Sequence, residues 1–233
     1  MNENTHVFSR KIENCMHLIA PTGTAFVRAL VVGCGSGEEA RELSTRFNCD
    51  VDGIDLWEAN FETIDNDRVR LHVMDAAHMS FPDATFDLLY SFHALEHIEE
   101  LDAALSEMRR VLKPDAVVFI GTPNKSRAFG YVGSATTLKM KLIWNLHDLL
   151  MRLRGRWENK YGAHAGFTAR ELQRLVASTF GPAVDVTLDY YLGVYAKHAP
   201  LIRLIHKTGL HEFLFPAVYV RAVVQNRCRN PDA

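Results

Sequence analysis

Short apolar runs alternate with helical patterns over the first half of the chain. Residues 29–32 are apolar without a break and end at Gly33, which is the pattern of a strand buried on both faces of a parallel sheet. The other elements of this half are predicted at 38–47 and 101–112 (helices) and at 51–55, 69–74, 86–91 and 116–121 (strands). Because strands that alternate with helices form βαβ units, the pattern predicts a parallel α/β sheet with right-handed crossovers.

The rhythm changes after residues 122–124. The next helix of a βαβ unit is predicted at 168–180, so residues 125–166 form an insertion. Strands at 184–188 and 218–224 complete the sheet, and a second helical elaboration is predicted over 192–214, around 196–207.

The insertion contains the most basic segment of the chain. Leucines and an isoleucine recur at mixed spacings of three and four over 137–154, which predicts an amphipathic helix. Two interpretations are open: the helix forms a lid over an acceptor that its aromatic and methionine side chains help to bind, or it packs on the sheet. Its basic face could be solvated or could meet an acidic substrate, a partner or a membrane surface.

Composition narrows the class of protein. The 233 residues fit one domain spanning 1–233, with an N-terminal helical segment at 1–26. A net charge of -2 gives no electrostatic drive toward nucleic acid, so none is expected as partner. The four cysteines lack C-x-x-C spacing, the N-terminus lacks an apolar signal core, and no apolar run is long enough to span a membrane. These features predict a cytoplasmic protein.

A glycine-rich loop follows the first strand. Gly33, Gly35 and Gly37, with Cys34 between the first two, stand where a strand turns into a helix, and glycine there lets backbone approach a ligand closely. Glu38 follows directly, with a second glutamate after it. Carboxylates at this helix start would repel a pyrophosphate, so the loop favours a ligand without phosphates.

Two aspartates end the second and third strands. Asp55 lies twenty-two residues after Gly33, where Rossmann-type sheets place a carboxylate that accepts ribose hydroxyls. Asp75 has the matching position one strand further on. Each could instead cap a helix or form a turn. Their joint occurrence after a glycine loop favours a nucleoside site.

Together these segments resemble the class I S-adenosylmethionine-dependent methyltransferases, of a small-molecule type similar to methyltransferase types 11 and 23. The resemblance covers about residues 27–190 and rests on ALVVGCGSGEEA, VDGIDL, VMDAAHMSFPDATFDLLYSFHALEHI, RRVLKPDAVVFIGTPN and AGFTARELQRLV. Asp115-Ala116 departs from it, because the family usually has a glycine pair there. The fold implied is Rossmann-like and three-layered (αβα), with a seven-stranded, mostly parallel sheet, an antiparallel last strand and a helical lid insertion.

The resemblance also implies ligands and roles. S-adenosylmethionine would be the cofactor and S-adenosylhomocysteine the product. The glycine loop, Cys34 included, would contact the methionine part, Asp55 with Leu56 the ribose, and Asp75 with Ala76 the adenine. Ser91, Phe92 and His93 would lie near the sulfonium.

A histidine cluster is the candidate catalytic group. The segment His93-Ala-Leu-Glu96-His97 follows the fourth strand, and His164 stands just before the helix at 168–180. Relatives with E-x-x-E-H hold a divalent metal here, so His93, Glu96, His97 and His164 form a candidate metal set, in which a histidine at the first position favours zinc over magnesium. The alternative is that His93, His97 or His164 assists a hydroxyl acceptor without metal, or only lines the cleft.

The function predicted is methyl transfer to a small molecule, with a hydroxyl oxygen as the first choice of acceptor atom. The acceptor would be hydrophobic or aromatic, and the protein a monomer or homodimer. Two alternatives stay open: an RNA terminal 2′-O-methyltransferase, and a scaffold or partner subunit that binds the cofactor without transferring methyl groups.

Overall fold

The computed structural model describes residues 16–20, 24–58, 61–130 and 137–225. The strands are β1 (Arg28–Val32), β2 (Asp50–Asp55), β3 (Val69–Val73), β4 (Phe86–Phe92), β5 (Leu112–Pro123), β6 (Ala183–Asp185) and β7 (Ala217–Val223). The α-helices are α2 (Glu38–Phe47), α3 (Leu101–Val111), α4 (Leu138–Leu153), α5 (Ala169–Phe180), α6 (Thr187–Val194), α7 (Ala199–Lys207) and α8 (His211–Leu214). Short 3₁₀ turns are η2 (Leu95–His97), η3 (Asn159–Tyr161) and η4 (Ala196–His198). Most of the predicted segment 1–26 lies outside the described residues.

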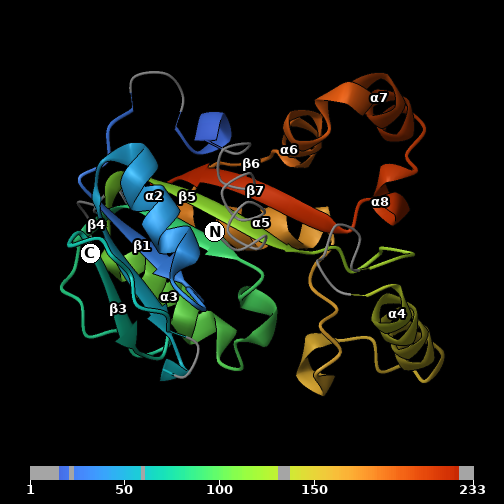
Figure 1. Ribbon diagram of the computed structural model, residues 1–233, viewed down its shortest axis with the longest axis horizontal. Coiled ribbons are helices and arrows are strands. Elements are labelled where there is room, and N and C mark those ends of the chain that lie inside the picture. Colours follow the sequence, from blue (N-terminus) through green and yellow to red (C-terminus); the bar gives the residue numbers. More distant parts are fainter. Residues whose placement is uncertain (1–15, 21–23, 59–60, 131–136, 226–233) are drawn as a thin grey trace, which may run out of the picture.

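The seven strands form one sheet in the order β3-β2-β1-β4-β5-β7-β6 (Figure 1). Strands β1 to β5 pair in parallel, and β7 runs antiparallel to both of its neighbours. The strand order reverses between β1 and β4, which is where open α/β sheets bind ligands at the carboxyl ends of their strands. The predicted Rossmann-like sheet with an antiparallel last strand is confirmed.

Each face of the sheet is covered by helices, which gives the predicted three layers. One core packs α3 and α5 on the sheet, for example through Met108 and Val176. The other packs α2, α6 and α7 on the opposite face, for example through Leu43, Tyr191 and Ile202. Strands β1 and β4 are buried on both faces of the sheet, which explains why their sequences are nearly continuous hydrophobic runs.

The sixth strand is shorter than predicted. It ends at Asp185, whose Oδ1 accepts a hydrogen bond from the Thr187 amide at 2.8 Å, and α6 begins at Thr187. The prediction of strand at 187–188 was therefore wrong, and the second helical elaboration starts at 187 rather than 192. Tyr190 of α6 stacks on Tyr219 of β7 with ring centroids 3.8 Å apart, so packing on the sheet fixes this aromatic segment as helix.

Helix α4 forms within the predicted insertion, but it does not pack on the sheet. Asp148 is its one buried residue, and the leucines that predicted a core-facing side are exposed. In Figure 1, α4 lies apart from the sheet, beside the chain that leads to α5. The interpretation of α4 as a helix packed on the sheet was wrong.

Candidate active site

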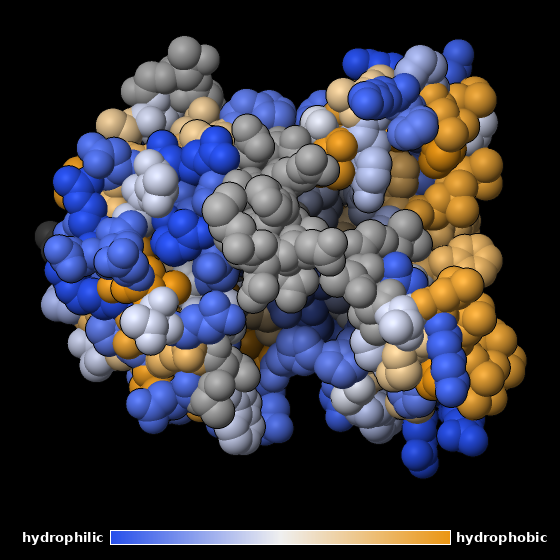
Figure 2. All heavy atoms as spheres, in the orientation of Figure 1, coloured by the Kyte–Doolittle hydropathy of each residue, from blue (hydrophilic) through white to orange (hydrophobic). Residues whose placement is uncertain are grey.

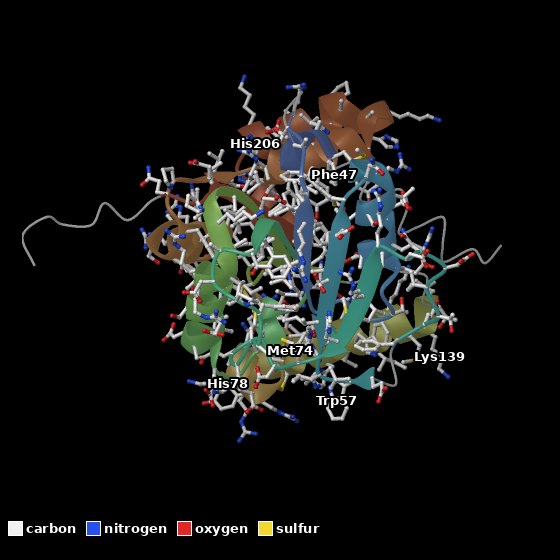
Figure 3. All side chains as sticks on the ribbon, turned by 90° about the vertical axis from the view of Figure 1, so that its left-hand side faces the viewer. Phe47, Trp57, Met74, His78, Lys139 and His206 are labelled. Atoms are coloured by element: carbon white, nitrogen blue, oxygen red, sulfur yellow. The ribbon has the colours of Figure 1, made fainter. Side chains whose placement is uncertain are left out.

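The carboxyl ends of the parallel strands bring the predicted site residues to one edge of the sheet. Figure 3 shows Trp57, which follows β2, and Met74, which follows β3, at this edge, with Lys139 of α4 toward the same end. Phe47, at the end of α2, lies at the opposite end. The loops that follow β1, β2, β3 and β4 can therefore contact one ligand.

The glycine loop adopts backbone conformations that require glycine. Gly33, Gly35 and Gly37 have φ of 73°, 52° and 89°. A Cβ on Gly33 would lie 2.3 Å from the Ala94 Cβ, whereas a Cβ on Gly35 would meet no described atom within 4 Å. Gly33 is thus needed for close packing, and Gly35 borders open space that a ligand can fill.

Asp55 and Gly35 are in direct contact. The Gly35 amide donates a hydrogen bond to Asp55 Oδ2 at 2.9 Å, and the Trp57 amide donates to Oδ1 at 3.2 Å. Asp55 therefore does form a turn, and it also fixes the glycine loop. Each carboxylate oxygen keeps a second lone pair that can accept a ribose hydroxyl. Leu56 beside it is exposed.

Asp75 has a turn contact of its own. Its Oδ1 accepts the Ala77 amide at 2.8 Å, and its side chain is half exposed. Ala76 is buried. The turn-forming role expected as an alternative is therefore present, and the second carboxylate oxygen, Oδ2, lies 3.7 Å from His78 Nδ1.

Ser91, Phe92 and Cys34 line the same edge in different ways. The Ser91 hydroxyl is buried and donates to the Val32 carbonyl at 3.1 Å, so it fastens β4 to β1. Phe92 is half-buried and its ring lies 4.6 Å from the His93 ring. Burial raises the pKa of the Cys34 thiol to about 12, which keeps it neutral beside the loop.

Four side chains of the predicted cluster converge. Glu96 Oε1 lies 3.8 Å from both His93 Nδ1 and His97 Nε2, and His97 Nε2 lies 3.4 Å from His164 Nδ1. The last pair joins residues sixty-seven positions apart in sequence. His93 and His164 both have positive φ, 56° and 47°, a conformation unusual outside glycine that often marks functional sites.

The surroundings set the protonation of this cluster. Burial, and then the neighbouring His164, lower the pKa of His97, so that its imidazole is neutral at physiological pH. Burial raises the pKa of Glu96 to about 7. The neutral His97 has a free lone pair on one ring nitrogen, which is the form that accepts a proton.

The side chains of this cluster are not arranged as the predicted metal site would require. Within the part of the chain that the structure describes, no group of three or more histidine, cysteine, aspartate or glutamate side chains is arranged to hold a metal ion.

Arg127 holds His164 in place, and sequence reasoning missed it. Its guanidinium donates to Asp148 Oδ2 at 3.1 Å and to the His164 carbonyl at 3.2 Å, and both charged side chains are buried. The guanidinium also donates to the Ala165 carbonyl at 3.1 Å. The one signal in the sequence was Asp148, an acidic residue within an apolar and basic helix.

The S-adenosylmethionine that the resemblance implies fits these residues. The open space beside Gly35 leaves room for its methionine part, and Asp55 offers acceptor oxygens where its ribose would lie. The glycine loop, the carboxylate at the end of β2 and the antiparallel β7 are the features of this structure that resemble the class I S-adenosylmethionine-dependent methyltransferases. Residues 30–120 match the family model described as a methyltransferase domain.

Proteins that are similar to this chain in sequence are also named as methyltransferases. The chain is 30% identical over 102 residues to 27-O-demethylrifamycin SV methyltransferase of Amycolatopsis mediterranei, an alignment that covers 40% of this chain and 38% of the relative. It is 26% identical over 200 residues to the ubiquinone biosynthesis O-methyltransferase of Psychrobacter arcticus, covering 77% of this chain and 76% of that one. The first curated relatives are matched over only 26% to 38% of their own length.

Solved structures share the fold. The plantazolicin methyltransferase BpumL in complex with SAH superimposes with a TM-score of 0.62 at 14% identity, covering 96% of this chain and 84% of that one. The phosphoethanolamine N-methyltransferase 2 of Haemonchus contortus gives a TM-score of 0.57 at 17% identity, covering 96% and 57%. At these identities the likeness concerns the fold alone.

Proposed function

We propose that the protein transfers a methyl group from S-adenosylmethionine to a hydroxyl oxygen of a hydrophobic small molecule. The observation that supports this most is the contact between His97 and His164 at 3.4 Å, next to the glycine loop edge. A neutral imidazole at the mouth of the cofactor site suits an acceptor that must lose a proton.

The cofactor, when bound, supplies a methyl group on a sulfonium, whose leaving group is already activated. In the transfer, the acceptor oxygen would bond to that methyl carbon as its bond to sulfur breaks, and a histidine nitrogen would take the hydroxyl proton. His97 is the first candidate for this base because its lowered pKa keeps it unprotonated. His164 holds the other end of the pair and can share the proton, and Arg127 positions His164 through its carbonyl.

The remaining residues of the site bind and orient. Asp55 fixes both the loop and the sugar, and Gly35 lets backbone approach closely. Alignment of oxygen, methyl carbon and sulfur is the larger part of such catalysis, because a well-oriented pair reacts as one molecule. We therefore expect the loss of a histidine to lower the rate of methyl transfer less than the loss of a cofactor contact does.

The names of relatives support oxygen as the acceptor atom. The ubiquinone relative is named an O-methyltransferase, and so is a probable tocopherol O-methyltransferase of Oryza sativa, 33% identical over 99 residues. The rifamycin relative is named for a 27-O-demethyl substrate. Sterol C-methyltransferases also match, so a carbon acceptor is the competing outcome. Ubiquinone, tocopherol and sterol are lipophilic, which favours a hydrophobic acceptor here.

A methyl-transfer assay tests the proposal. The protein would be incubated with radiolabelled S-adenosylmethionine and four acceptor sets: prenylated phenols and catechols, macrocyclic alcohols, sterols, and RNA with free 2′-hydroxyls. We expect label in the first or second set. Transfer to RNA alone, or to a sterol carbon alone, would contradict the proposal, and cofactor binding without transfer to any set would favour the scaffold alternative.

Two histidine variants sharpen the assay. His97→Gln and His164→Gln should each lower kcat about a hundredfold, the usual range for general base catalysis, while S-adenosylhomocysteine binding stays unchanged. His147→Gln, an exposed histidine on α4, is the matched control. Full activity in both site variants would rule out the pair as the base.

A further inference from the structure

Helix α4 turns its polar side toward the protein and its apolar side toward solvent. Asn145 accepts the Gly130 amide at 2.7 Å and donates to the Gly130 carbonyl, and Asp148 pairs with buried Arg127. Arg152 donates to the Lys125 and Arg127 carbonyls. These bonds fix the rotation of the helix about its axis, so its apolar side is held outward by the fold.

The outward side of α4 is a continuous row of large aliphatic side chains. Leu138, Leu142, Leu146, Leu149 and Leu153 recur at spacings of three and four, and each is at least 50% exposed. Ile143 and Leu150 widen the row. A soluble monomer rarely exposes so large a contiguous apolar surface without a binding role.

A second apolar surface continues the first. Leu201 and Leu204 of α7, and Leu210, Phe213 and Leu214 in and beside α8, are exposed. The segment 124–130 holds both helical groups, since the Ala128 amide donates to the Phe213 carbonyl at 2.7 Å while Arg127 holds α4. Phe129, on the same segment, is 64% exposed. Figure 2 shows hydrophobic residues along one rim of the molecule, over α7 and α8 at one end and α4 at the other. We call this surface the leucine rim.

Positive charge accompanies the leucine rim. Residues 137–156 contain five lysines and arginines and one acidic residue, and residues 196–214 contain three and one, in a chain with a net charge of -2. Lys139 lies within the leucine row, and Arg154 and Arg156 are exposed just after it. Among the described residues, no carboxylate pairs with any of these three cations. Long basic side chains beside leucines can lay their alkyl stems on an apolar phase and keep their charges at its polar boundary.

We infer that the leucine rim docks on a membrane surface that carries anionic lipid headgroups, with α4 lying in the plane of the interface. An amphipathic surface of leucine and phenylalanine flanked by lysine and arginine matches both parts of such a surface. A second copy of the chain matches less well. A twofold contact would place these cations opposite their own equivalents with few carboxylates to pair them. No helix of the described residues is long and apolar enough to cross a bilayer.

Vesicle binding of the full chain tests this inference, and it does not depend on methyl transfer. We expect the protein to co-sediment with phosphatidylcholine vesicles that contain about 30 mol% phosphatidylglycerol at least tenfold more than with phosphatidylcholine alone. Equal binding to both vesicle types, or none to either, would overturn the inference. So would a dimer in sedimentation velocity that dissociates in the leucine variant below.

Paired variants identify the surface. Leu146→Ser/Leu149→Ser should weaken binding about tenfold or more through the lost apolar contact. Arg154→Glu/Arg156→Glu should weaken it about as much and remove its salt dependence. The matched controls are Val27→Ser/Val184→Ser and Arg170→Glu/Arg174→Glu, equally simple changes at exposed positions of other elements. Loss of binding in a control as large as in its rim variant would refute the assignment. Unchanged melting temperature and S-adenosylhomocysteine affinity would show that the rim variants fold.

Discussion

Within the candidate active site, burial disfavours the ionised form of Glu96. Burial raises its pKa from 4.5 to about 7, which corresponds to about 3 kcal/mol. The folded pKa lies above the unfolded one, so this amount of folding stability depends on pH. It is fully present below about pH 4.5, where Glu96 is protonated in both states, and is lost as the pH rises through 7.

Glu96→Gln should therefore change how stability depends on pH. Glutamine cannot ionise, so the variant should gain about 3 kcal/mol relative to the parent protein between pH 4.5 and pH 8. Urea unfolding at several pH values measures this, with exposed Glu99→Gln as control. A difference between Glu96→Gln and parent that does not change with pH would contradict the pKa assignment.

Gly35→Ala separates the binding role of the loop from its folding role. A Cβ there enters open space, so folding should lose only about 1 kcal/mol for the left-handed conformation. The same methyl group occupies room that the cofactor needs, and S-adenosylhomocysteine affinity should fall at least about tenfold. Calorimetry and urea unfolding of the variant give both numbers, and Gly155→Ala, another left-handed glycine in open space, is the control. Unchanged affinity in Gly35→Ala would place the cofactor elsewhere.

Position along the chain was enough to predict the residues at strand ends. Gly35 and Asp55 meet because adjacent parallel strands end at one edge, and the same rule brings His93 and His97 there. His164 was predicted from the resemblance and is found against His97. Arg127 could not be found this way, because its role depends on a partner in the insertion whose placement no spacing rule gives.

At the scale of elements, one buried ion pair attaches α4. Arg127→Met leaves Asp148 buried without a counter-charge, and this should cost about 3 to 5 kcal/mol of folding free energy. The double variant Arg127→Met/Asp148→Leu should recover part of that loss, since both charges are gone. Urea unfolding of Arg127→Met, Asp148→Leu and the double variant, with the parent protein, forms the cycle. Strict additivity of the two single losses would mean that the pair does not interact.

Helix and strand boundaries were predictable wherever hydrophobic period and sheet position agreed. The first five strands and α2, α3 and α5 lie within a few residues of their predicted bounds. The segment at 187–188 was predicted as the end of a strand, whereas the stacking of Tyr190 on Tyr219 stabilises a helix there. The period of α4 was also correct, but a period cannot tell which side faces the protein. The contacts of Asn145 and Asp148 turn the polar side of α4 toward the protein and leave its apolar side exposed.

Over the whole molecule, Arg127 connects the candidate active site to the leucine rim. It binds the carbonyl of His164 on one side and Asp148 of α4 on the other. A lipophilic acceptor taken from a membrane would enter beside the element that contacts that membrane. The proposed chemistry and the inferred docking surface are thus compatible, and each has its own test.

Every catalytic role proposed for this protein requires a nucleoside site between the glycine loop and the end of β2. Titration calorimetry of the full chain with S-adenosylhomocysteine tests it most directly, in parallel with Asp55→Ala and with Asp67→Ala, an exposed aspartate in the loop before β3. We predict one site per chain and full affinity in Asp67→Ala. In Asp55→Ala the affinity should fall by about a hundredfold or more, because the ribose hydroxyls would lose hydrogen bonds to a charged carboxylate. No binding by the parent protein, or equal binding by Asp55→Ala, would contradict the account.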